Sequence, residues 1–202
     1  MDVKVYQLNP GMAEDYIRYF DGRAFADGNP ERACYCVWHH WTQRQEEERS
    51  LLPEHERPHC KRDYARALIE QGTLNGFAAY ADGQMVGFCN ADNREHYFRL
   101  SRENRPEIWE KTLPGEKVLT IVCYIVAPDL RRRGIAKALL AHACHYAAEN
   151  GFDYVEGYPV QGTFTPRDCG GSAAMYREQG FELIDIPGGV VARKRVSTPS
   201  AR

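Results

Sequence analysis

Residues 118–136 read VLTIVCYIV, APDL and RRRGIA, and this stretch is the strongest indication of the fold class. Its first nine residues are apolar almost without interruption, which predicts a central strand covered on both faces. APDL then ends the strand, and from Gly134 apolar residues recur four apart along one face as far as Ala147, which indicates a helix. The stretch therefore predicts a buried strand that leads through a short turn into a helix.

The start of that helix is a predicted anion site. The first N–H groups of a helix have no partner within the helix and attract phosphate. Gly134 lets the backbone approach a bulky anion, and the small Ala136 lets the first turn lie close to it. Arg131, Arg132 and Arg133 supply charge for phosphate oxygens. Such a site suits a diphosphate better than a lone anion.

The flanking sequence predicts an α/β chain with one domain, residues 1–196, and a disordered tail, residues 197–202. Asp82-Gly83 joins two apolar runs and is the signature of a type I′ hairpin. Strands are expected at 3–8, 76–81, 84–91, 118–126, 153–159, 181–186 and 189–194, and helices at 12–25, 61–71, 134–150 and 172–179. We expect an irregular or partly helical excursion at 27–60 and a loop or short helix at 93–117.

Composition narrows the function classes. The 202 residues carry a formal net charge of −2, with both signs spread along the chain, so no overall field favours nucleic acid or an anionic membrane. No window approaches the roughly 18 apolar residues of a membrane-spanning helix, and the first residues lack the pattern of a signal peptide. The seven cysteines are odd in number, which favours reduced thiols in a cytoplasmic protein.

Two ordered motifs resemble those of the GNAT acetyltransferase superfamily. VAPDLRRRGIA, residues 126–136, is similar to its Q/R-x-x-G-x-G/A signature, and MYREQGFELI, residues 175–184, is similar to its C-terminal (L/M)Y-x-x-x-GF element. The resemblance runs from about Gly76 to the final strands, and residues 27–60 look like the N-terminal segment of one poorly characterised bacterial branch. It implies the acyl-CoA N-acyltransferase fold, a mixed and mostly antiparallel splayed sheet flanked by helices.

The resemblance also implies a binding site for acetyl-CoA. Strands 118–126 and 153–159 would separate to admit the pantetheine arm, which would bond unpaired backbone groups of residues 123–126. A β-bulge there would aim an N–H at the thioester carbonyl. Cys169 stands where the superfamily often has Asn, whereas Ser172 occupies a place where Ala or Ser is usual. The implied cofactor-binding residues are Tyr124, Ile125, Val126, Arg131, Arg132, Arg133, Gly134, Ile135, Ala136 and Ser172.

The implied reaction is direct attack by a neutral amine of a small molecule or peptide on the thioester. Tyr176 matches the tyrosine that protonates the departing thiolate, and its ordinary pKa of about 10 suits that transfer. The candidate general bases are Asp92 and Glu95. His96 is a further candidate, and a chain of waters could take the role of any of these residues. The sequence leaves open whether an acetyl or a longer acyl group is transferred, and whether the protein is a monomer or a homodimer.

Other functions are weighed against this one. The rival is a non-catalytic acyl-CoA-binding sensor or regulatory module, since the strand 118–126 offers no carboxylate; nucleic-acid binding through 131–133 and 193–195 is weaker. Cys34, Cys36, His39 and His40 fit no standard zinc spacing, so we expect no metal and assign them to an acceptor pocket or the core. Cys123 is expected to be a core thiol rather than a nucleophile.

Overall fold

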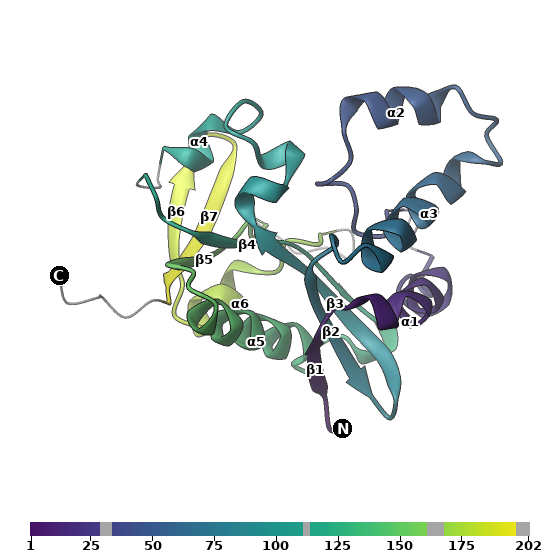
Figure 1. The fold of residues 1–202 in the computed structure, drawn as a ribbon. Coiled ribbons are helices and arrows are strands. Elements are labelled where there is room, and N and C mark those ends of the chain that lie inside the picture. The colour runs from purple at the N-terminus through teal and green to yellow at the C-terminus, as the bar shows by residue number, and fades with distance from the viewer. Residues whose placement is uncertain (29–33, 111–113, 161–167, 197–202) are drawn as a thin grey trace.

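One mixed sheet organises the protein. The computed structural model describes residues 1–28, 34–110, 114–160 and 168–196, and within them seven strands follow the order β1-β2-β3-β4-β5-β7-β6 (Figure 1). The strands are β1 (Lys4–Gln7), β2 (Gly76–Ala81), β3 (Gln84–Asn93), β4 (Val118–Val126), β5 (Tyr154–Gly157), β6 (Glu182–Ile186) and β7 (Gly189–Arg195). The α-helices are α1 (Ala13–Arg18), α2 (Gln43–Ser50), α3 (Arg57–Glu70), α4 (Pro106–Trp109), α5 (Ile135–Glu149) and α6 (Ala173–Glu178).

The centre of the sheet is where the pairing changes. β4 and β5 are parallel, whereas every other neighbouring pair of strands is antiparallel. Their register runs only from Val118↔Tyr154 to Ile121↔Gly157, although β4 continues to Val126. Beyond Ile121, β4 keeps β3 on one side and has separated from β5 on the other. The predicted mixed, mostly antiparallel and splayed sheet is therefore confirmed.

Of two local features expected in the sheet, the hairpin turn is as predicted and the bulge lies next to its predicted place. Asp82 and Gly83 both have positive φ, 51° and 74°, as a type I′ turn between β2 and β3 requires. A β-bulge also interrupts the β3–β4 ladder, because Asn90 pairs with Cys123 while Ala91 pairs with Ile121. The extra residue is Val122, one position before the stretch in which a bulge was expected.

Helices cover both faces of the sheet. Figure 1 shows α5 and α6 together on one side, with α1 and α3 on the other. The buried stripe of α5, which includes Ile135, Leu139, Ala143 and Ala147, is the one that the fourfold spacing predicts. α1 is shorter than predicted, since a π-helical turn, Tyr19–Arg23, replaces its second half.

The two segments without clear periodicity are partly helical. Within residues 27–60, the described part holds α2, which begins with a capping box between Thr42 and Gln45, and the first turn of α3. Residues 94–109 hold the 3₁₀ turns Arg94–His96 and Phe98–Leu100 and then α4. Further 3₁₀ turns are Pro10–Met12 and Pro128–Leu130. The predicted tail, 197–202, and residues 161–167 of the predicted Gly- and Pro-rich connection lie outside the described residues.

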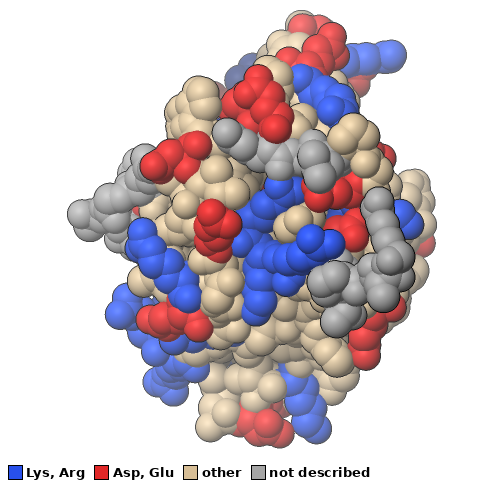
Figure 2. Space-filling model, turned by 90° about the vertical axis from the view of Figure 1, so that its left-hand side faces the viewer, with Lys and Arg blue, Asp and Glu red and all other residues tan. Residues whose placement is uncertain are grey.

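Two observations concern nucleic-acid binding and membrane insertion, the properties that the composition argues against. Figure 2 shows Lys and Arg side chains interspersed with Asp and Glu across one face. Among the described helices, none combines the length and the apolar character needed to cross a bilayer.

Candidate functional site

A cavity of about 670 Å³ opens beside the splayed part of the sheet. Its walls come from the end of β4, the turn and first residues of α5, and residues 168–178. The predicted cofactor residues that line it are Tyr124, Ile125, Val126, Arg131, Arg132, Gly134, Ile135, Ala136 and Ser172. Arg133 is the one member of the predicted set that is not among the lining residues.

The first turn of α5 presents backbone N–H groups to this cavity. Gly134 precedes the helix with φ 86°, a left-handed conformation that favours glycine, and no side chain caps the helix start. The N–H of Ala138 closes the first helical turn onto Gly134 O at 2.9 Å. The N–H groups of residues 135–137 therefore lack an acceptor within the helix, and the helix dipole adds positive potential there.

The three arginines before α5 have different roles. Arg131 Nη1 lies 2.6 Å from Asp27 Oδ2, and Arg131 Nε donates to Val126 O at 3.3 Å. Its charge is therefore already paired, and it fixes the turn between β4 and α5. Arg132 is exposed and lines the cavity, with φ 65°, whereas Arg133 is exposed and is not among the lining residues. The prediction that all three supply charge to one anion stays a prediction, and Arg132 is the member that lines the cavity outside the pair with Asp27.

Sequence reasoning missed a charged pair at the same cavity. Lys137 of α5 forms an ion pair with Glu178 of α6, and both residues line the wall. Lys137 follows Gly134 by three positions, so it lies within the same helical turn. That spacing was a usable signal for Lys137. Glu178 had none, because its approach to α5 depends on the tertiary fold.

The open edge of β4 is partly occupied by the chain itself. The N–H of Tyr124 donates to Cys169 O at 2.7 Å, so the expectation that this group is unpaired is wrong. Because backbone groups alternate along a strand, the N–H of Val126 points to the same edge as that of Tyr124. Cys169, the departure from the superfamily pattern, thus closes the edge at Tyr124 through its carbonyl.

Tyr176, the predicted proton donor, lies behind the cavity wall. It is completely buried and is not among the lining residues. Its ring fits over Gly157, where a Cβ would stand 2.0 Å from the tyrosine oxygen. Burial raises the pKa of Tyr176 well above its ordinary value, and it raises the pKa of Tyr124 in the same way. Tyr124 does line the cavity, and its ring meets Tyr176 edge-to-face at 6.4 Å between centroids.

The predicted bases lie outside the residues that line the cavity. Asp92, near the end of β3, is buried and pairs with Asn75 Nδ2 at 2.9 Å and His96 Nδ1 at 3.0 Å. Glu95 is exposed in the 3₁₀ turn that follows. The fold therefore joins Asp92 to His96 and leaves Glu95 in solvent.

The cysteine and histidine residues near position 36 divide between cavity and core. Cys34 and Cys36 line the cavity. His39 is mostly buried, and His40 lies 3.4 Å from Asn90 Nδ2. Among the described residues, no group of three or more His, Cys, Asp or Glu side chains could hold a metal ion. Cys123 is buried, as predicted, but it also lines the cavity and contacts Cys36.

Known proteins share this architecture. The model of the acetyltransferase (GNAT) family matches residues 37–181, and no curated protein matches the chain. The fold is similar to a Drosophila melanogaster polyamine N-acetyltransferase that forms N-acetylagmatine, at 15% identity and TM-score 0.53 over 96% of this chain and 100% of that one. It is also similar to the PaiA N-acetyltransferase of Thermoplasma acidophilum in complex with coenzyme A, at 15% identity and TM-score 0.52 over 96% and 99%.

Proposed function

This chain belongs to the acetyltransferase (GNAT) family, and from that premise we propose that it moves an acetyl group from acetyl-CoA to an amine of a small molecule or peptide. The observation that carries the proposal is one cavity that joins the uncapped start of α5 to the open edge of β4. An anion-binding helix start and a strand edge suit the diphosphate and the amide-bearing pantetheine arm of coenzyme A.

The residues at the start of α5 fit a diphosphate. Three N–H groups without helical acceptors face the cavity, and Arg132 adds a charge that Arg131 does not. Apart from Gly134 itself and its two neighbours in the chain, no described atom lies within 4 Å of the point where Gly134 would carry a Cβ, so an anion has room to approach the backbone. Lys137 would reach a second phosphate if the Glu178 pair opened.

The edge of β4 fits an extended, amide-bearing chain, with one restriction. Because Cys169 O occupies the N–H of Tyr124, pantetheine would bond first at Val126. Acetyl-CoA, when bound, supplies a thioester carbonyl that a neutral amine can attack. The bulge at Val122 redirects the backbone just before the cavity-lining part of β4, and we assign the N–H that stabilises the oxyanion to this part of the strand.

A pair of tyrosines is the proposed source of the proton for the departing thiolate. Tyr124 lines the cavity and Tyr176 stands directly behind it. Because Tyr124 is the member of the pair that lines the cavity, we propose it as the proton donor, with Tyr176 in a supporting position; burial raises the pKa of both hydroxyls alike. For the amine's proton we keep Asp92, Glu95, His96 and a chain of waters as candidate routes; Asp92 and His96 are held together at 3.0 Å, and none of the three residues is among those that line the cavity.

Turnover with a panel of amines tests the proposal. The panel includes a polyamine, because a similar structure acetylates one, together with peptide α-amines and lysine amines. We expect amine-dependent release of coenzyme A thiol, with the acetyl group found on the acceptor by mass spectrometry. Saturable acetyl-CoA binding without turnover for any amine would instead support the non-catalytic acyl-CoA-binding module.

A further inference from the structure

Four cysteines from three separate segments meet at one end of the cavity. This thiol cluster consists of Cys34, Cys36, Cys123 and Cys169, all of which line the wall. Cys34 and Cys36 come from the loop before α2, Cys123 from β4, and Cys169 from the segment before α6. The proposed function uses none of the four thiol groups.

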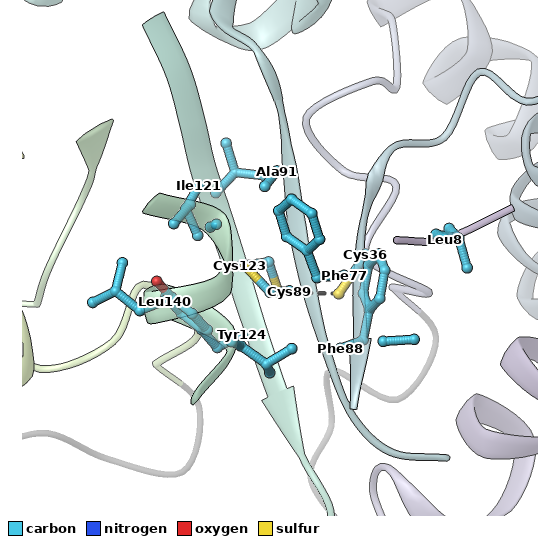
Figure 3. Close-up of a cluster of buried hydrophobic side chains, with 14 of the residues drawn as sticks. Leu8, Cys36, Phe77, Phe88, Cys89, Ala91, Ile121, Cys123, Tyr124 and Leu140 are labelled. Carbon is cyan, nitrogen blue, oxygen red and sulfur yellow. Dashed lines mark hydrogen bonds between the residues drawn. The ribbon is translucent and has the colours of Figure 1, made fainter. Parts of the chain in front are cut away.

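Within the cluster, Cys123 interacts with both Cys36 and Cys169, and its sulfur is in direct contact with that of Cys36. Cys36 Sγ lies 3.0 Å from Cys123 Sγ, and Figure 3 shows the two side chains pointing toward each other across the gap between loop and strand. Both residues are almost fully buried. The separation is only about 1 Å longer than the ~2.05 Å of an S–S bond, so covalent closure requires little movement.

The backbone that carries Cys36 is strained and firmly held. Tyr35 and Cys36 have φ values of 47° and 51°, a left-handed conformation that is strained in a residue with a Cβ. Tyr16 Oη donates to Tyr35 O at 2.8 Å, and Asn90 Nδ2 donates to Cys36 O at 2.6 Å. These bonds from α1 and β3 fix the unusual conformation that places the Cys36 sulfur against β4.

The position of the pair along β4 defines what it faces. From Cys123, a member of the thiol cluster, β4 runs on to Val126. The carbonyl of Val126 accepts a hydrogen bond from Arg131, just before α5. If the diphosphate binds at α5, the opposite end of the pantetheine arm lies toward Cys123. This step rests on the proposed function, under which the thioester and the amine meet beside the two sulfurs.

We propose that Cys36 and Cys123 form a reversible disulfide when a hydroperoxide enters the cavity, and that the crosslink fixes the loop that carries Cys36 to β4 at the thioester end of the site. One thiolate attacks a peroxide oxygen, which breaks the O–O bond and gives a sulfenic acid and hydroxide; this hydroxide takes up the proton that the first thiol released and becomes water. The second thiolate attacks that sulfur and displaces hydroxide, which takes up the remaining proton. In total, two thiols and one hydrogen peroxide give one disulfide and two waters.

The same burial makes the reaction slow at neutral pH. The thiolate is the reactive form, and burial raises the pKa of Cys36 to about 11. The titratable groups that face it are the thiols of Cys34, Cys89, Cys123 and Cys169 and the hydroxyls of Tyr16 and Tyr19. Disulfide formation is therefore expected to accelerate as the pH rises toward that pKa, which suits a response to sustained oxidation.

Peptide mapping tests the crosslink itself. The full chain is exposed to hydrogen peroxide at about pH 8.5, its free thiols are alkylated, and a non-reducing digest is analysed by mass spectrometry. We expect a Cys36–Cys123 crosslinked peptide and the loss of two of the seven thiols, both reversed by dithiothreitol. Cys60→Ser, which removes a thiol on α3 that does not line the cavity, should keep the crosslink.

Cys36→Ser should abolish the crosslink, and Cys36→Ala serves if the serine variant does not fold. A different pairing, such as Cys123–Cys169, or alkylated Cys36 and Cys123 after other thiols have been oxidised, would overturn the proposal.

Activity measurements test the effect of the crosslink separately. In the crosslinked protein, amine-dependent turnover should fall by about tenfold or more, because the fixed loop can no longer adjust to align the amine with the thioester. Acetyl-CoA affinity, measured by calorimetry, should change little, since the start of α5 lies at the other end of the cavity. A crosslinked protein with undiminished turnover would refute this effect. If reduced protein has no turnover with any amine, the proposed function fails while the mapping result still decides the disulfide.

Discussion

At the scale of single residues, the two tyrosines beside the cavity have different proposed roles: Tyr124 donates the proton to the thiolate, and Tyr176 supports Tyr124. Tyr124 lines the cavity, whereas Tyr176 is fully enclosed against Gly157. We predict that Tyr124→Phe lowers kcat by about 10²-fold or more and that Tyr176→Phe has a smaller effect. Neither change should alter acetyl-CoA affinity. Steady-state kinetics with calorimetry checks this, and a larger loss in Tyr176→Phe would restore the donor role to Tyr176.

His39 gives a prediction about pH and stability. Burial lowers its pKa to about 4, with further lowering by the charges of His40 and Arg99. Between about pH 6.5 and pH 4 the unfolded chain therefore binds a proton that the folded chain does not. The free energy of unfolding consequently decreases as the pH is lowered through this range. The expected loss attributable to His39 is about 2 kcal/mol from pH 6.5 to pH 5.

Urea denaturation at the two pH values measures this loss. His39→Gln removes the titrating group and should flatten the dependence, while the same change at the exposed His55 should not. An unchanged slope in His39→Gln would show that other groups carry the acid sensitivity.

The site residues that sequence could predict are those with a local pattern. The wall from Tyr124 to Ala136 is nearly continuous in sequence, so one strand–turn–helix motif locates it. The pairing of Arg131 with Asp27 joins residues 104 positions apart, and nothing near either residue signals it. The thiol cluster has the same property, because its members come from three segments that only the fold brings together.

At the scale of elements, the two ends of α5 allow a matched comparison. Gly134 and Gly151 have φ values of 86° and 73°, and both have open space where a Cβ would stand. We predict that Gly134→Ala and Gly151→Ala each destabilise the fold by about 1 kcal/mol, the cost of left-handed backbone in a residue with a Cβ. Only Gly134→Ala should weaken acetyl-CoA binding.

Urea denaturation and calorimetry on both variants check this. Equal losses of affinity in the two variants would mean that the helix start has no special role in binding.

The elements that sequence predicted best are those with strong periodicity or punctuation. The hairpin at Asp82-Gly83 and the helix from Gly134 have a turn signature and a regular apolar stripe. α2 offered neither, because it is entirely polar and has no buried residue within its span. Its capping box and its contact with α3 define it instead, and α3 itself begins four residues before the predicted start.

At the scale of the whole molecule, the site is a consequence of how two parts of the sheet join. β4 and β5 pair in parallel over four residue pairs and then separate, so a strand edge in the middle of the sheet remains open. The start of α5 lies at the end of β4 because only a short turn connects them. An exposed strand edge and an uncapped helix start therefore face one cavity, and coenzyme A has polar groups suited to both.

Calorimetric titration of acetyl-CoA into two variants, each with one alanine of α5 replaced by glutamate, tests whether the cavity binds the cofactor. Ala136→Glu places bulk and negative charge at the cavity wall, whereas Ala141→Glu makes the same change on the exposed face of the helix. An acidic residue in the first turn suits the helix dipole, so the fold should tolerate the first change. We predict that Ala136→Glu abolishes acetyl-CoA binding and that Ala141→Glu binds like the unaltered protein; equal affinities for the two variants would contradict the assignment of the cavity.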